Sequence, residues 1–344
     1  MVNMNGPVKM ASYDMAGKTA VVTGGTKGIG KAIALAFGQC GVNVVVAGRH
    51  EDECTAVAEA ITSAGGHGKG IRTDVRNIDE IDALIAGAAE NFGGVDILIN
   101  CAGVAITKKI LDLDVEDYDM IMETNLRSVL FASKAAAAVM KASEKGGKII
   151  NIASVGGLKG TSALSLYGAS KAGVINLTKT MALEWSRYGI QTNAVCPGYV
   201  VTEINKAEFE NEKFKEHVLK TIPQRRLGTV DEVAALVLFL ASDMSGMING
   251  EAIVADMGAI CGSSEYVIRL VSTIYVKFSK NSKKYPSFLA ANISRRKTCV
   301  CSEKGWIFFT FDLEKLFRIL GRIKFFRTVG QSKTTDHCQD DTDK

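Results

Sequence analysis

Short apolar stretches alternate with longer amphipathic ones along the first three quarters of the chain. The short stretches are rich in Val and Ile, which is typical of strands buried on both faces of a sheet; they cover residues 19–23, 42–47, 68–72, 96–100, 148–152, 191–195 and 251–255. Segments with helical spacing separate them, among them 30–37, 79–92, 115–140, 166–188 and 230–241. Strands that alternate with helices in this way predict an α/β fold: a doubly wound, seven-stranded parallel sheet with helices on both faces.

The chain changes character near residue 262. Residues 1–261 have a net charge of −4 and contain 30 of the 34 glycines, whereas residues 262–344 have a net charge of +8 and contain eight of the 14 phenylalanines. We therefore expect a flexible leader at 1–15, one large domain at 16–261, and a basic, aromatic-rich extension of unknown role at 262–344.

The composition excludes several classes of protein. With 47% hydrophobic and 23% charged residues among 344, the chain can bury a sizeable core. It has no long uncharged apolar run and no cationic start leading into one, so we expect a cytoplasmic location. The eight cysteines are scattered, which fits a reducing compartment, and the four histidines show no ligand spacing, so we expect no metal site.

A glycine-rich turn follows the first predicted strand directly. The sequence Thr23-Gly-Gly-Thr-Lys-Gly-Ile-Gly30 lets the backbone turn sharply and approach a pyrophosphate at the start of a helix. A turn of this kind can also occur without a ligand. Its Gly-x-x-x-Gly-x-Gly spacing resembles that of the short-chain dehydrogenase/reductase family, whose sheet is of the Rossmann type.

Further groups of residues extend this resemblance over roughly residues 16–261. Asp74 follows the third strand, and Asn100-Cys101-Ala102-Gly103 follows the fourth, where the family commonly has Asn-Asn-Ala-Gly. Further on come Pro197-Gly198, and Asp256-Met257-Gly258, where relatives often have Asp-Gly-Gly. Asn125 stands where the family has a helical asparagine, and the most specific feature is Ser154 followed by Tyr167 and Lys171 in the family's order and spacing.

The resemblance implies hydride transfer between a nicotinamide cofactor and a carbonyl or secondary alcohol. Tyr167 would be the acid/base, and Lys171, one helical turn away, would lower its pKa from the usual value of about 10. Ser154 would hydrogen-bond to the substrate oxygen, and Asn125 would position a water next to Lys171. A catalytically inactive scaffold or sensor that binds dinucleotide and acts through partners is the alternative.

The resemblance also implies which residues bind the cofactor. An acid at Gly48, after the second strand, is typical of relatives that prefer NAD, whereas Lys27 and Arg49 match basic positions of those that prefer NADP. We therefore favour NADP over NAD, although Arg49 could also be an ordinary surface charge. The expected cofactor-binding residues are Gly24, Thr26, Lys27, Gly28, Ile29, Gly30, Arg49, Asp74, Val75, Asn100, Ala102, Gly103, Tyr167, Lys171, Pro197, Gly198, Val200 and Thr202.

The sequence says less about the identity of the substrate. The sequence resembles both 3-oxoacyl carrier-protein reductases and gluconate or polyol dehydrogenases. Phe131 and Leu183 occupy positions where carrier-protein reductases often have arginines, although Lys134, Lys141 and Lys145 could supply other cations. In the expected substrate loop at 200–227, Glu203, Phe209 and Phe214 either contact substrate or fill helix faces.

The expected partners are a small-molecule carbonyl or alcohol and further copies of the chain, in a homodimer or homotetramer. We expect no nucleic-acid partner. In the extension, apolar residues 313–323 follow a basic amphipathic pattern that would suit a membrane surface. We favour a poorly ordered tail, a helix packed on the enzyme, or appended sequence over membrane binding as the explanation of the extension.

Overall fold

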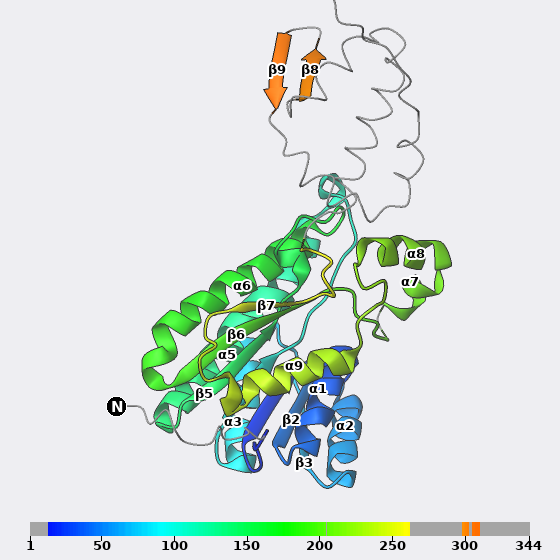
Figure 1. Cartoon of the computed structure of the whole chain (residues 1–344). Helices are drawn as coiled ribbons and strands as arrows, with labels where there is room; N and C mark the ends of the chain where they lie inside the picture. The colour runs from blue at the N-terminus through cyan, green and yellow to red at the C-terminus, as the bar shows by residue number, and fades with distance from the viewer. Residues whose placement is uncertain (1–12, 204, 262–297, 303–304, 310–344) are drawn as a thin grey trace, which may run out of the picture. The chain divides into compact units, whose positions relative to one another are not determined.

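The computed structural model describes residues 13–203, 205–261, 298–302 and 305–309 (Figure 1). The chain divides into two units, Met1–Gly262 and Ser263–Lys344. In the second unit, β8 (Thr298–Ser302) and β9 (Gly305–Phe309) pair as an antiparallel hairpin. Residues 1–12 of the expected leader and the amphipathic segment at 313–323 lie outside the described residues, whereas Met15, at the end of the leader, is buried in the core.

The first unit is built on the predicted seven-stranded parallel sheet, with strand order β3-β2-β1-β4-β5-β6-β7. The order reverses between β1 and β4, which is where open α/β sheets form a ligand crevice at the carboxyl ends of their strands. The strands are β1 Thr19–Thr23, β2 Asn43–Gly48, β3 His67–Arg72, β4 Ile97–Asn100, β5 Gly147–Ile152, β6 Ile190–Pro197 and β7 Ala252–Ala255.

Helices cover both faces of the sheet because successive residues of a strand point to opposite sides. On β1, Val22 packs into a cluster with residues of α1 and α9, whereas its neighbour Val21 packs with residues of α3 and α5. The sequence-based fold prediction is thus confirmed. The helices are α1 Gly28–Gln39, α2 Glu51–Ser63, α3 Ile78–Phe92, α4 Val115–Met122, α5 Ser128–Ala142, α6 Ser165–Trp185, α7 Lys206–Glu210, α8 Glu212–Thr221 and α9 Val230–Ala241.

The amphipathic segment predicted at 115–140 is not one regular helix. A π-helical turn at Glu123–Arg127 interrupts it between α4 and α5. The Asn125 side chain in this turn is fully buried and exchanges two hydrogen bonds with the backbone of Val104, as donor to its carbonyl oxygen (2.9 Å) and as acceptor from its amide (2.8 Å). Hydrophobic periodicity carries no signal for such a local widening, which is frequent at functional sites.

Candidate active site

The turn between β1 and α1 can be built only from glycine at two positions. Gly24 has a φ of +65°, and a Cβ there would lie 2.8 Å from the Cα of Ala102; a Cβ on Gly30 would lie 2.1 Å from the carbonyl oxygen of Gly24. The Thr23 hydroxyl accepts a hydrogen bond from the amide of Cys101 at 3.1 Å. The turn therefore packs directly on the segment that follows β4, and the two predicted cofactor-binding segments meet.

The N-terminus of α1 faces this turn with its amide groups. Lys27 is the N-cap residue and makes no side-chain cap hydrogen bond, and the first amide of a helix has no partner within the helix. The Gly28 amide donates to Oε2 of Glu203 at 3.2 Å, and Thr202 lies against Gly28, with its Cγ2 3.2 Å from where a Cβ would be. A carboxylate oxygen thus accepts a hydrogen bond from the amide of a residue that is expected to bind the cofactor.

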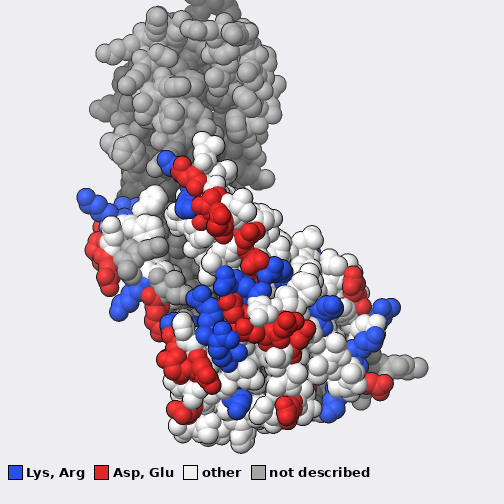
Figure 2. All heavy atoms as spheres, turned by 180° about the vertical axis from the view of Figure 1, so that it is seen from behind, with Lys and Arg blue, Asp and Glu red and all other residues white. Residues whose placement is uncertain are grey.

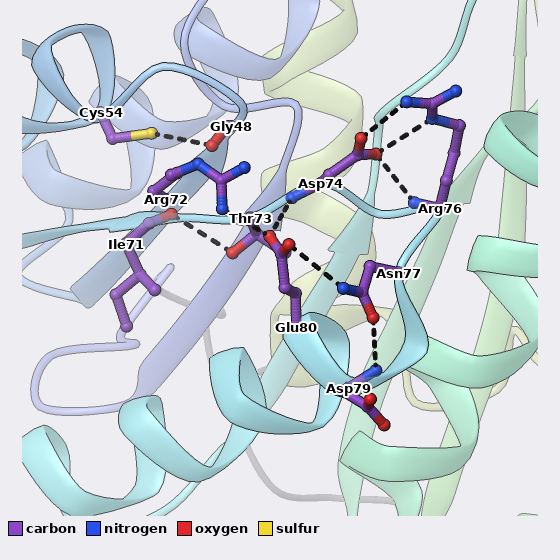
Figure 3. A network of polar contacts seen from close by, with 10 residues as sticks. All are labelled: Gly48, Cys54, Ile71, Arg72, Thr73, Asp74, Arg76, Asn77, Asp79 and Glu80. Carbon is purple, nitrogen blue, oxygen red and sulfur yellow. Dashed lines mark hydrogen bonds and ion pairs between the residues drawn. The ribbon is translucent and has the colours of Figure 1, made fainter.

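Asp74, at the end of β3, is held by an ion pair (Figure 3). Arg76 donates to its two oxygens from Nη2 at 2.9 Å and Nε at 3.3 Å, and the Arg76 amide adds a third contact at 3.0 Å. These bonds lower the pKa of Asp74. A carboxylate has about four acceptor positions, so one is left for the adenine contact that the resemblance implies. Glu80 accepts a 2.8 Å hydrogen bond from the amide of Asp74 and fixes the backbone.

Asn100 differs from the other predicted cofactor residues. Its amide donates both hydrogens inside the fold, to the Ser133 hydroxyl at 2.9 Å and to the side-chain oxygen of Asn151 at 2.8 Å. The side chain therefore joins β4 to β5 and α5, and it has no donor left for a ligand. Val75, which is buried, packs into the sheet core.

The four residues predicted to be catalytic lie around two glycines. A Cβ on Gly103 would lie 3.4 Å from both Oδ1 of Asn125 and Nζ of Lys171. A Cβ on Gly156 would lie 3.4 Å from the Ser154 hydroxyl oxygen and 3.5 Å from Cε1 of Tyr167. The absence of side chains at these two positions leaves room beside each pair, which fits a site that must admit a cofactor and a substrate.

Backbone contacts hold these four residues in place. Asn125 donates to the hydroxyl of Ser170 at 3.1 Å, and that hydroxyl donates to the carbonyl oxygen of Tyr167 at 2.7 Å. The Ser154 hydroxyl accepts from the amide of Gly156 at 3.0 Å. These bonds link the π-helical turn to the start of α6, and Lys171 links α6 to the end of β5 through its hydrogen bond to the carbonyl oxygen of Ile152.

The electrostatics of Tyr167 and Lys171 are governed by burial. Burial raises the pKa of Tyr167 above its usual value, and the Ser154 hydroxyl opposes this only in part. Burial also lowers the pKa of Lys171 to about 8. The expected lowering of the tyrosine pKa by Lys171 is not seen in the protein alone, because removal from water destabilises both charged forms. Cys101 is no nucleophile at neutral pH, since burial raises its pKa to about 11.

The segment after β6 covers the carboxyl end of the sheet. A Cβ on Gly198 would lie 2.7 Å from the Cβ of Asp256, so Pro197-Gly198 passes close to the end of β7. Val200 is buried in the core beside α9. Phe209 is also buried and packs in an apolar cluster with α8, so it fills a helix face.

The position expected to select the cofactor has little space. A Cβ on Gly48 would lie 2.7 Å from Cγ2 of Thr26, which leaves no room for an acid without a shift of that side chain. Arg49 is exposed, and Nζ of Lys27 lies 2.6 Å from Oε1 of Glu53, in the first turn of α2. Sequence reasoning missed Glu53; the signal was the acidic run that follows Arg49.

Phe131 and Leu183 both lie on the α5–α6 face of the domain. Leu183 is 84% exposed at a hollow of about 480 Å³ whose lining includes Lys134, Lys141 and Arg187. Cations are thus present near the two apolar positions, as the sequence had left open. Figure 2 shows basic and acidic side chains interspersed on the face of the domain drawn there.

Comparison with known proteins decides the family. A sequence profile described as "Enoyl-(Acyl carrier protein) reductase" matches residues 24–259. The chain is 37% identical to 2-dehydro-3-deoxy-D-gluconate 5-dehydrogenase of Escherichia coli, over 72% of this chain and 98% of that protein. It is 38% identical to 3-oxoacyl-[acyl-carrier-protein] reductase of Vibrio cholerae, over 69% and 95%. The chain belongs to the short-chain dehydrogenase/reductase family.

A solved structure agrees with this assignment. The structure of a short-chain alcohol dehydrogenase from Sinorhizobium meliloti superposes with a TM-score of 0.70 at 34% identity, over 73% of this chain and 99% of that one. This member of the short-chain family is therefore an NAD(P)-dependent oxidoreductase of alcohols or ketones.

Among the described residues, no helix has the length and apolar character to cross a membrane, and no group of His, Cys, Asp and Glu side chains is arranged to hold a metal ion.

Proposed function

We propose that this enzyme interconverts a small-molecule carbonyl and the corresponding secondary alcohol with NADP(H), and that Tyr167 transfers the proton. The observation that carries the proposal is the convergence of Asn125, Ser154, Tyr167 and Lys171 on the space beside Gly103 and Gly156. These four polar side chains come from three separate parts of the chain. Each lies beside one of the two glycines, where there is no side chain to fill the space. A catalytically inactive scaffold or sensor would not need all four polar residues in this arrangement. The arrangement therefore favours catalysis over that alternative.

The protein's contribution is orientation and proton transfer. The cofactor supplies the hydride chemistry and, when oxidised, a positive charge beside the site. Ser154 donates a hydrogen bond to the substrate oxygen, and the Tyr167 hydroxyl gives that oxygen a proton in reduction or accepts one in oxidation. Because burial raises the pKa of Tyr167, the hydroxyl stays protonated at neutral pH and has a proton to give in carbonyl reduction, whereas accepting a proton in oxidation requires a lower pKa, which the positive charge of the oxidised cofactor would favour.

The residues present fit a dinucleotide. The glycine turn and the amides of α1 would hold the pyrophosphate, Asp74 and Val75 the adenine, and Lys171 the nicotinamide ribose. Arg49 and Lys27 would contact the 2′-phosphate, and the crowded Gly48 leaves no place for the acid typical of NAD-preferring relatives. These features support NADP as the preferred cofactor. By the same resemblance, we infer a homodimer or homotetramer.

The experiment that tests the catalytic role is Tyr167→Phe, which removes only the hydroxyl. We expect folding and NADPH binding to be retained and turnover to fall by about 10²–10⁴-fold, the usual contribution of a positioned acid/base. The matched control is Tyr118→Phe, because Tyr118 is exposed on α4 and is not one of the four residues. A panel of ketones, keto-sugars and 3-oxoacyl thioesters supplies the substrate. More than a tenth of the activity left in Tyr167→Phe would exclude the role, and cofactor binding without turnover on any substrate would favour the scaffold.

A further inference from the structure

Lys27 and Glu53 form an ion pair at the position proposed above for the 2′-phosphate of the cofactor's adenosine. Lys27 precedes α1 and Glu53 lies in the first turn of α2, and their Nζ and Oε1 atoms are 2.6 Å apart. The hydrogen bond from Lys27 lowers the pKa of Glu53, so the carboxyl is ionised at neutral pH. The cation assigned above to the 2′-phosphate thus already has an anionic partner.

This pair contributes little to the stability of the fold. The Lys27 side chain is 53% exposed and that of Glu53 is 30% exposed, and exposed ion pairs typically stabilise a protein by about 0–1 kcal/mol. As the third residue of α2, Glu53 also places a negative charge at the helix N-terminus, which stabilises a helix modestly and which Glu51 and Asp52 supply as well. A structural requirement therefore gives no strong reason for a carboxylate here, and its removal should leave the protein folded.

The two forms of the cofactor respond differently to a carboxylate at this place. A 2′-phosphate that approaches Lys27 must either displace Glu53 or lie close to its negative charge, and like charges a few ångströms apart repel strongly near a protein surface. A 2′-hydroxyl has no such conflict, because carboxylates accept hydrogen bonds from ribose hydroxyls in many NAD sites. A carboxylate at Glu53 would therefore weaken the binding of the 2′-phosphorylated cofactor and not that of the cofactor with a 2′-hydroxyl.

We propose that Glu53 is a specificity-determining residue that holds back the enzyme's preference for NADP by competing with the 2′-phosphate for Lys27. This proposal rests on the cofactor site described under the proposed function. In this proposal a residue of α2 has the effect that an acid at Gly48 has in NAD-preferring relatives, which is to disfavour the 2′-phosphate. The consequence is an enzyme whose affinity for phosphorylated adenosine lies below what Lys27 and Arg49 could provide together.

The test uses Glu53→Gln, which keeps the shape of the side chain and removes its charge. Adenosine 2′,5′-bisphosphate and 5′-AMP are titrated into the full-length protein by calorimetry, so that the readout does not depend on activity. We expect the Kd of the bisphosphate to fall about fivefold or more and the Kd of 5′-AMP to change less than about twofold. In a Lys27→Met background the gain from Glu53→Gln should be smaller, because only direct repulsion of the 2′-phosphate by Glu53 remains; an equal gain in both backgrounds would overturn the competition for Lys27.

Asp52→Asn is the matched control, because it removes one negative charge from the same helical turn without touching Lys27. An equal gain in Asp52→Asn and Glu53→Gln would mean a general charge effect and would overturn the proposal. A loss of affinity in Glu53→Gln would mean that the carboxylate only positions Lys27, and would also overturn it. If neither ligand bound the wild-type protein, the assigned cofactor site would be wrong, whereas failure of the Tyr167 test alone would leave this proposal standing.

Discussion

The Lys171 ammonium donates a 2.8 Å hydrogen bond to the carbonyl oxygen of Ile152, the last residue of β5. This contact joins α6 to the sheet at the point where the four catalytic candidates meet. It also keeps a lysine in a place where 4% of its surface is exposed. The cost of removing the charge from water appears as the lowered pKa of Lys171, about 8.

The lowered pKa of Lys171 predicts how the free energy of unfolding changes with pH. Between about pH 8 and the unfolded value near 10.4, the unfolded chain binds a proton that the folded protein lacks, so this lysine makes folding more favourable as pH rises. Relative to Lys171→Met, the wild-type free energy of unfolding should therefore increase from pH 7.5 to pH 10, by up to about 1.4 kcal/mol for each pH unit between the two pKa values. Urea unfolding at several pH values measures this difference, and a difference that does not vary with pH would contradict the assignment.

The space beside Gly103 can be tested with one methyl group. In Gly103→Ala the new Cβ would touch Oδ1 of Asn125 and Nζ of Lys171, so we expect an intact fold and a loss of kcat/KM of about tenfold or more. Gly160→Ala is the control, because a Cβ at Gly160 has no neighbour within 4 Å. Steady-state kinetics and melting temperatures of both variants separate a filled site from a destabilised protein. Equal activity in the two variants would show that the space is not used.

The fold was predictable from the sequence for identifiable reasons, whereas the roles of the site residues stay predictions. Strands such as Thr19–Thr23 are buried on both faces and therefore read as short apolar runs, and the glycine turn needs its glycines for steric reasons that the spacing reveals. The sequence did not reveal contacts between distant segments. The Lys27–Glu53 pair and the contact of Glu203 with Gly28 depend on how α2 and the 200–203 segment pack on the turn, which no local pattern encodes.

Cofactor preference at Gly48 should change only when room is made for the new side chain. Gly48→Asp alone would place its Cβ 2.7 Å from Cγ2 of Thr26, so we expect reduced binding of both cofactors. Thr26→Ser removes that methyl group, and the double variant should then shift the ratio of kcat/KM values toward NADH by about tenfold or more, through repulsion of the 2′-phosphate. Thr26→Ser alone is the control. An unchanged ratio in the double variant would count against the placement of the 2′-phosphate.

The boundary near residue 262 remains a prediction, and a shortened chain ending at Ser264 tests it. All seven strands of the parallel sheet, both large core clusters and every candidate site residue precede residue 262, so we expect this chain to fold and to bind NADPH within about twofold of the full-length affinity. The exposed apolar side chains of the α5–α6 face, Leu183 above all, belong to the shortened chain as well. An oligomer formed through that face should therefore persist in the shortened chain, and light scattering after size-exclusion chromatography of both chains measures it. If the shortened chain aggregated and bound no NADPH, the extension would be part of the domain; if it bound NADPH but became monomeric, the extension would contribute to the assembly and not to the cofactor site.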